Sequence, residues 1–307
     1  MLIYMNNYEN LIKNLCPYKK IELNNEKNLQ FFLNKHSTKE GTWGYLELKK
    51  GEVDFIFLDG NGKELSRRSL HEAHPTLLVP PACWHKLLPK GPELDATLTF
   101  YCQPHRYFEK KYGLAPLHHD LRYVQQTYLQ NKKQMTILDV GCGSGRNPLY
   151  FAMAGHHVTG LDNNKHAIQN IQSIAEKEQL SAIKLKLHDL NFPLPSLDAV
   201  FDFIYCTVTL QFLDKTRIKP LLTQLQQYTA AGGMNFFVFP VQAEPYSYPH
   251  SFTYLPEPKE LYHFYQDSGW SILEYHEKPG QLHKLDATGK PKQGMFALLL
   301  AQKHLAI

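Results

Sequence analysis

The residues best suited to binding a ligand lie in a glycine-rich turn after a short apolar segment. Asp139 is followed by Gly141, Gly143 and Gly145, after which a helix is expected to begin. Glycine lets a backbone turn tightly and approach a ligand closely. A second apolar run ends in Asp162, and an acid there can accept hydrogen bonds from both ribose hydroxyls of a nucleoside. This arrangement indicates binding of a nucleoside-containing cofactor.

The spacing of the three glycines excludes the common phosphate-binding loops. It is G-x-G-x-G rather than the dinucleotide pattern G-x-G-x-x-G, and no phosphate-binding lysine follows it. The pattern is typical of methyltransferases that use S-adenosylmethionine (SAM). That cofactor has no phosphate, so the turn is expected to face its methionine end.

The other candidate residues follow further predicted strands, because open α/β sheets bind ligands beyond the carboxyl ends of their strands. Asp189 and Leu190 would hold and cover the adenine, and Thr207 and Val208 would line the sulfonium side. Arg146, near a helix N-terminus, could reach the methionine carboxylate or could simply be a surface residue. The predicted cofactor residues are Asp139, Gly141, Gly143, Arg146, Asn147, Asp162, Asn163, Asp189, Leu190, Thr207 and Val208.

Strands and helices alternate from residue 135 onward, which predicts a doubly wound, Rossmann-like parallel sheet with helices on both faces. The predicted strands are 137–140, 157–161, 183–188, 201–206, 234–239, 270–276 and 295–301, and the predicted helices are 146–154, 165–179, 215–228 and 259–266. Gly232-Gly233 is expected to form a turn. The last two strands, joined by a segment with no clear helical pattern, are expected to form an antiparallel hairpin at the sheet edge.

The N-terminal third is expected to be a small all-β domain, a cupin-like sandwich. Short alternating strands are predicted at 43–48, 52–59, 63–70, 76–79, 85–88 and 96–102, with a hairpin turn at Asn61-Gly62. Residues 1–25 look irregular apart from a short helix near 8–15. We therefore predict three segments: a β-sandwich domain over 1–104, a helical linker over 105–134 and a methyltransferase domain over 135–307.

Composition excludes several other classes of protein. The 307 residues are 43% hydrophobic and 20% charged, with a net charge of +4 and no large basic patch, so a nucleic-acid partner is not expected. Five cysteines without C-x-x-C spacing favour a reducing compartment and no zinc ribbon. No signal peptide or membrane-spanning run is evident, so a cytoplasmic location is expected.

Several stretches resemble the tellurite methyltransferases of the TehB family. Two of them, 139–147 and 201–213, are common among methyltransferases in general, whereas Gly280–Gly289 is the specific one. In the N-terminal third, 37–44, 84–85 and 100–102 resemble the β-domain of the longer TehB proteins, and 107–112 resembles their linker. The resemblance extends over both parts of the chain in the same order.

The resemblance implies a SAM-dependent methyltransferase that converts tellurite, and selenite as a second oxyanion, to methylated products and so confers tellurite resistance. His283 would orient the oxyanion and Lys284 would add electrostatic attraction, although His283 could instead cap a turn beside Asp286. The sequence departs from the family at Phe239–Gln242, where a small-residue run with Met is common, and at Pro291, where an arginine is common.

Alternatives remain open at this stage. The acceptor could be a thiol or another small metabolite, or the chain could be a non-catalytic sensor of SAM or an anion. No metal site is expected, since His36, His71, His74 and His85 lack the H-x-H…E pattern of metal-binding cupins. We expect a small oxyanion as partner, expect neither nucleic acid nor membrane, and leave a homodimer open.

Overall fold

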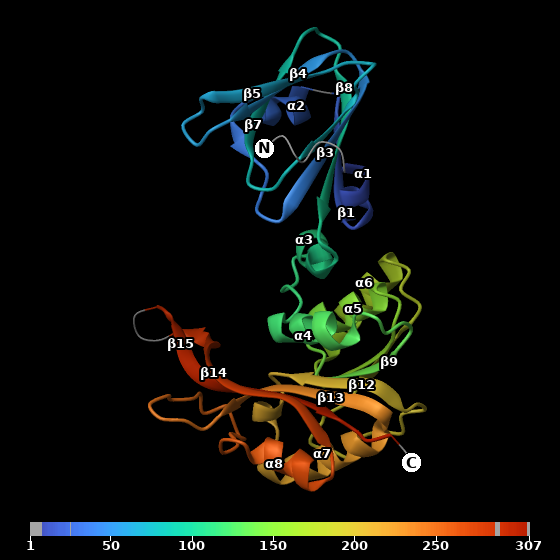
Figure 1. The fold of residues 1–307 in the computed structure, drawn as a ribbon, viewed down its shortest axis with the longest axis vertical. Helices are drawn as coiled ribbons and strands as arrows, with labels where there is room; N and C mark the ends of the chain where they lie inside the picture. The colour runs from blue at the N-terminus through green and yellow to red at the C-terminus, as the bar shows by residue number, and fades with distance from the viewer. Residues whose placement is uncertain (1–7, 25, 286–288, 306–307) are drawn as a thin grey trace. The chain divides into compact units, whose positions relative to one another are not determined.

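The chain forms two compact units, Met1–Gly113 and Leu114–Ile307. The structure is a computed structural model that describes residues 8–24, 26–285 and 289–305, and the side chains of 8, 9, 26, 27 and 283–285 lie outside that description (Figure 1). The division falls inside the expected linker 105–134. Helix α3 (Tyr107–Tyr112) consequently belongs to the first unit and helix α4 (His119–Val124) to the second.

The first unit contains two four-stranded antiparallel sheets, with strand orders β1-β8-β3-β6 and β2-β7-β4-β5. Its elements are α1 (Tyr8–Lys13), β1 (Cys16–Leu23), α2 (Glu26–Leu33), β2 (His36–Ser37), β3 (Thr42–Lys50), β4 (Val53–Leu58), β5 (Glu64–Leu70), β6 (Thr76–Val79), β7 (Trp84–Pro89), β8 (Asp95–Cys102), η2 (Pro104–Arg106) and α3. Side chains of both sheets, such as Leu46 and Phe55, form one buried cluster. The predicted β-sandwich is confirmed.

Strand β1 was not predicted, because residues 1–25 looked irregular, and α2 lies between residue 25 and the first predicted strand, where no element was predicted. Strand β1 pairs with β8 from Cys16 opposite Cys102 to Leu23 opposite Ala96. Pro17 and the lysines that follow it interrupt the alternation of polar and apolar residues, and the pairing register shifts between Pro17 and Lys19. An edge strand tolerates proline because its outer N–H groups need no partner in the sheet.

The predicted turn between β4 and β5 is confirmed. Asp59 Oδ1 accepts hydrogen bonds from the backbone N–H groups of Asn61 (2.9 Å) and Lys63 (2.8 Å), and Gly62 has φ +90°. Such a φ value suits glycine because it lacks a Cβ atom.

The second unit is built on a seven-stranded sheet with the order β11-β10-β9-β12-β13-β15-β14. All neighbours are parallel except β15, which runs antiparallel to both β13 and β14. The elements are α4, η3 (Gln125–Leu129), β9 (Thr136–Val140), α5 (Arg146–Met153), β10 (His157–Asp162), α6 (Lys165–Lys177), β11 (Ile183–Leu187), β12 (Phe201–Thr207), η4 (Leu210–Phe212), α7 (Lys215–Tyr228), β13 (Thr229–Val241), α8 (Glu260–Asp267), β14 (Ser271–Leu285) and β15 (Pro291–Gln302).

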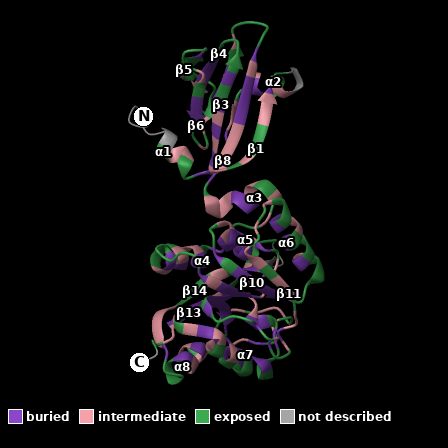
Figure 2. Ribbon diagram, turned by 90° about the vertical axis from the view of Figure 1, so that its right-hand side faces the viewer, coloured by how far each residue is buried: buried purple, intermediate pink, exposed green. Residues whose placement is uncertain are grey.

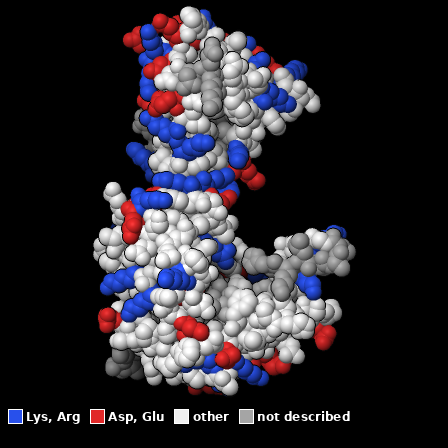
Figure 3. All heavy atoms as spheres, turned by 180° about the vertical axis from the view of Figure 1, so that it is seen from behind, with Lys and Arg blue, Asp and Glu red and all other residues white. Residues whose placement is uncertain are grey.

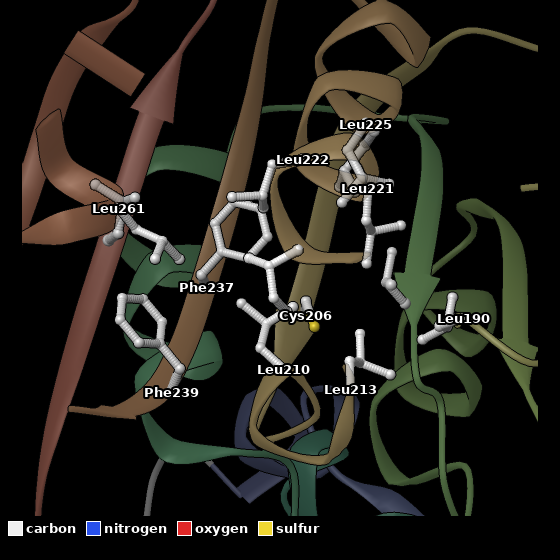
Figure 4. Close-up of a cluster of buried hydrophobic side chains, with 14 of the residues drawn as sticks. Leu190, Cys206, Leu210, Leu213, Leu221, Leu222, Leu225, Phe237, Phe239 and Leu261 are labelled. Carbon is white, nitrogen blue, oxygen red and sulfur yellow. The ribbon is translucent and has the colours of Figure 1, made fainter. Parts of the chain in front are cut away.

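Helices cover both faces of this sheet, α4, α5 and α6 on one side and α7 and α8 on the other (Figure 1). Because successive side chains of a strand point to opposite faces, β13 serves both cores. Phe237 and Phe239 pack toward α7 and α8, whereas Phe236 and Val238 belong to the cluster with α4 and α5. Buried residues therefore lie in the interior of the unit (Figure 2), and Figure 4 shows side chains on the α7 side of the core.

Two local predictions in this unit were wrong. Gly232-Gly233 does not form a separate turn before the strand but lies inside β13. The register of its pairing with β12 shifts there: Phe201 is opposite Thr229, and Phe203 is opposite Met234. Strand β14 continues to Leu285, well past the predicted end at residue 276. Gly280 lies opposite Gly294 in the β14–β15 pairing, so the glycines that suggested a loop sit together within the ladder. The antiparallel edge hairpin itself is confirmed.

None of the helices in the described ranges is both long and apolar enough to cross a membrane. On the face drawn in Figure 3, Lys and Arg side chains of the second unit are interspersed with acidic and uncharged ones. The feature of this unit that most strongly suggests ligand binding is therefore a hollow in its surface rather than a concentration of charge.

Candidate active site

A pocket of about 1140 Å³ lies at the carboxyl ends of the strands of the second unit. It brings together all of the predicted cofactor residues except Asp139, namely Gly141, Gly143, Arg146, Asn147, Asp162, Asn163, Asp189, Leu190, Thr207 and Val208. These residues lie at or after the carboxyl ends of β9, β10, β11 and β12. We call the part of the pocket built on β9, β10 and β11 the β9–β11 half.

The glycine turn fixes Asp162 at the mouth of this half. The backbone N–H groups of Gly143 and Asn164 donate to Asp162 Oδ2 and Oδ1, each at 2.8 Å. Each carboxylate oxygen has a second lone pair, so both remain able to accept from a ligand. A Cβ atom on Gly141 (φ +85°) would overlap the side chain of Thr209, whereas one on Gly143 would meet nothing within 4 Å. The turn is thus tight on one side and open on the other.

Asp139 lies beneath the pocket rather than in its wall. It is fully buried, and neither carboxylate oxygen has a hydrogen-bond partner among the described residues. Burial raises its pKa to about 8, against the opposing effects of the nearby Tyr205 hydroxyl and of the positive charge of Arg146. Since Arg146 lines the pocket, Asp139 can influence a ligand through that guanidinium.

The other half of the pocket is built on β13, β14 and β15, and we call it the β13–β15 half. Its lining includes Val238, Leu282 and Phe296, with Phe212 and Phe252 nearby in a T-shaped pair at 5.3 Å. Lys278 of β14 contributes a positive charge to this half. The wall is therefore largely apolar, with few charged groups.

Residues 115–120, which lead into the start of α4, line the pocket but were not predicted to belong to the site. Asp120 accepts a hydrogen bond from Lys278 Nζ at 2.6 Å, and its other oxygen lies 3.2 Å from His119 Nε2. The sequence signal was a bare His-His-Asp triplet. Its partner on β14 is 158 residues away, so no local pattern could have joined them.

His118 is anchored at the centre of the pocket through its backbone. Its N–H donates to Asn147 Oδ1 at 3.2 Å, and Asn147 Nδ2 donates to Thr207 Oγ1 at 3.2 Å. The imidazole is only 8% exposed, and its Nδ1 atom is buried without a hydrogen-bond partner. Burial, helped by the charge of Arg146, lowers the pKa of His118 to about 3, so the ring is neutral at physiological pH.

Within the described residues, one trio of potential metal ligands comes together: His118, His119 and Asp120, whose ligand atoms lie within 4.8 Å of one another. Asp120 is already paired with the ammonium group of Lys278, whose charge would repel a cation. In the first unit, the ring centroids of His36 and His85 lie 4.1 Å apart, and the backbones of His71 and His74 form an isolated antiparallel β-bridge. These four histidines do not form such a trio.

The predicted catalytic pair His283 and Lys284 lies in β14, but both side chains are outside the described part of the structure. Their roles remain predictions. Two cysteines near the site are buried, Cys142 in the glycine turn and Cys206 in the core next to α7.

Comparison with known proteins identifies the family. The model for tellurite resistance protein TehB matches residues 100–300, and the model for the TehB-like domain matches residues 19–98. The chain belongs to the TehB family. Its two units correspond to the two parts of the longer TehB proteins, as the resemblance implied.

Two of the related proteins are similar to this chain over nearly its whole length. A probable S-adenosyl-L-methionine-dependent methyltransferase TehB of Haemophilus influenzae is 34% identical over 290 residues, 94% of this chain and 98% of that protein. The crystal structure of TehB from Haemophilus influenzae superimposes with a TM-score of 0.87 at 33% identity, covering 95% of this chain and 99% of that one. Hemagglutinin 1 of Eikenella corrodens is 31% identical over 80% of this chain and 79% of that protein.

A putative methyltransferase from Bacillus halodurans shares the fold of the second unit alone. It has a TM-score of 0.51 at 15% identity, covering 61% of this chain and all of that one. The predicted fold class, a class I methyltransferase sheet preceded by a small β-domain, is therefore confirmed.

Proposed function

We propose that this TehB-family protein is a SAM-dependent methyltransferase whose acceptor is tellurite, with selenite as a second oxyanion. The observation that carries the proposal is the geometry of the glycine turn. It opens into the pocket at Gly143 and holds Asp162 by two backbone N–H groups, with free lone pairs at the pocket mouth. This is the arrangement that a nucleoside with two ribose hydroxyls requires.

The residues of the β9–β11 half fit the cofactor part by part. Asp162 would accept from the ribose hydroxyls, Asp189 would accept from the adenine amino group, and Leu190 would cover the ring. Arg146 lies in the first turn of α5, where a helix N-terminus favours an anion, so it would face the methionine carboxylate. SAM supplies a methyl group on a positively charged sulfur, which is an excellent leaving group.

The protein must then hold the acceptor close to that methyl group and collinear with its bond to sulfur. Tellurium in tellurite has a lone pair that carries no proton, so a strong base is not required. Holding an oxyanion does require positive or hydrogen-bond-donating groups. We assign this task to His283 and Lys284, and His283→Ala should lower turnover while leaving SAM affinity nearly unchanged.

The test is turnover of methyl-labelled SAM with tellurite, selenite and a small thiol in parallel, read as S-adenosylhomocysteine and labelled product. Tellurite should give product, and Asp162→Asn should weaken SAM binding by about 10-fold or more, since it replaces a hydrogen bond to a charged group. Asp198→Asn, at an exposed acid, is the matched control. Tight SAM binding without product from any acceptor would contradict the proposal and favour a sensor of SAM.

A second candidate is the methylation of a small thiol or other organic acceptor. The apolar wall of Phe212, Phe252, Leu282 and Phe296 favours it, because such a surface gains more from an organic group than from an oxyanion. Product from the thiol alone in the same assay would select this candidate.

A further inference from the structure

We propose that His118 contacts the acceptor directly and that the acceptor is bound in a protonated form, with a hydroxyl group donating to His118 Nδ1. This rests on the proposed function and adds a catalytic residue outside the Gly280–Gly289 stretch. The acceptor class is a small oxyanion that keeps one O–H group, such as hydrogen tellurite or hydrogen selenite.

The position of His118 places it beside the acceptor rather than the nucleoside. Its backbone is bonded to Asn147 and through it to Thr207, at the carboxyl end of the central strand β12. Two residues further on, Asp120 is paired with Lys278 of β14, at the edge of the sheet. The segment 118–120 therefore spans from the middle of the pocket to the β13–β15 half, away from Asp162 and Asp189 on the β9–β11 half.

The imidazole of His118 has a nitrogen that lacks a hydrogen-bond partner within the described part of the chain. Its Nδ1 atom is buried, and no described residue bonds to it. A buried polar atom without a partner costs free energy, so such atoms in proteins usually have a partner or a functional reason. The backbone N–H of His118 makes the anchoring bond to Asn147, so the side chain is not needed for that bond.

Among the titratable groups around His118, Arg146, His119 and Lys278 favour the neutral ring, whereas Asp120 favours the protonated one. The guanidinium of Arg146 opposes protonation of the imidazole, and its effect exceeds the opposite effect of Asp120, whose charge is paired with that of Lys278. A neutral imidazole with a free nitrogen accepts a hydrogen bond, and a fully ionised oxyanion offers none, whereas a hydroxyl does.

The hydrogen bond also suits the chemistry of the transfer. The lone pair on tellurium forms the new carbon–tellurium bond while the carbon–sulfur bond breaks and leaves its electron pair on sulfur. The hydroxyl proton stays on the acceptor oxygen, held by Nδ1, so hydrogen tellurite and the sulfonium give a neutral methylated acid and S-adenosylhomocysteine. Charge and protons balance without a further reactant.

The experiment compares two substitutions of similar size in the full-length protein. His118→Leu removes the nitrogen, whereas His118→Asn keeps an acceptor oxygen near the position of Nδ1. His263→Ala, at an exposed residue of α8, is the control for the loss of a histidine. Each protein is assayed for kcat/KM with tellurite and selenite. Calorimetry then measures binding of S-adenosylhomocysteine to each protein. A second titration measures binding of tellurite to the complex of each protein with S-adenosylhomocysteine.

We expect His118→Leu to lower kcat/KM for tellurite and selenite by about 50-fold and to weaken tellurite binding similarly, the size expected for one hydrogen bond in which a single partner is charged. Binding of S-adenosylhomocysteine should stay within about 3-fold, and His118→Asn should restore most of the activity.

Each other result has a distinct meaning. Unchanged tellurite kinetics in His118→Leu, or loss of S-adenosylhomocysteine binding, would overturn the role of His118 while leaving the proposed function intact. A wild-type protein that binds S-adenosylhomocysteine but neither binds nor methylates any oxyanion would overturn both. Equal losses in the Leu and Asn variants would reduce His118 to a packing residue.

Discussion

Asp139 shows how a fold can change the chemistry of a single residue. In the unfolded chain its carboxyl has an ordinary pKa of 3.8, whereas burial raises the folded value to about 8. Between these values the folded protein holds a proton that the unfolded chain has released. Stability must therefore decrease as the pH rises through this range.

Asp139→Asn keeps the shape of the side chain and removes the titration. From about pH 5 to about pH 8, the wild type should lose on the order of 3 kcal/mol of stability relative to this variant. Urea unfolding at several pH values, followed on the transition of the second unit, measures the difference. Parallel pH profiles for the two proteins would show that the carboxyl of Asp139 is already ionised in the fold.

At the scale of elements, the turn between β9 and α5 decides the shape of the pocket. Gly141 and Gly143 both have positive φ values, +85° and +52°, but they differ in their surroundings. A Cβ atom at Gly141 would overlap Thr209, whereas one at Gly143 would face open space. An alanine at Gly143 therefore tests the cost of the positive φ alone, whereas an alanine at Gly141 adds the cost of steric overlap.

Gly141→Ala should destabilise the second unit by about 3 kcal/mol, since it adds overlap with Thr209 to the cost of a positive φ. Gly143→Ala carries only the conformational cost, about 1 kcal/mol, yet places a methyl group in the space that we propose for the cofactor. Thermal or urea unfolding measures the loss of stability in each variant, and SAM titration measures the loss of cofactor affinity. Equal losses of stability would mean that Thr209 moves aside without cost.

The same turn explains what could be predicted from the sequence. Asp139, the glycines and Asp162 belong to a contiguous strand–turn–helix–strand unit, so their spacing alone places them at one edge of the sheet. Strand β1 was missed because Pro17 interrupts its alternation, and the length of β14 was missed because Gly280 and Gly294 pair across the ladder. Asp120 and Lys278 meet only when α4 packs near β14, a contact that no local pattern encodes.

At the scale of the molecule, each unit has a hydrophobic core of its own. Leu46 belongs to the cluster of the first unit and Leu221 to the cluster beside α7, and both are almost fully buried (1% and 0% exposed). The pocket and every predicted cofactor residue lie in the second unit. Since a ligand stabilises only the structure that binds it, the two units should respond differently to SAM.

Leu46→Ala and Leu221→Ala make this difference measurable. Each leaves a cavity in one core and should cost about 3 kcal/mol. Scanning calorimetry should then show two transitions, of which Leu46→Ala lowers one and Leu221→Ala lowers the other. Saturating SAM should raise only the transition that Leu221→Ala lowers, and the Leu46→Ala protein should bind SAM as the wild type does. If both substitutions lower a single shared transition, the two cores unfold together. The β-domain then contributes to the stability of the pocket without supplying any of its walls.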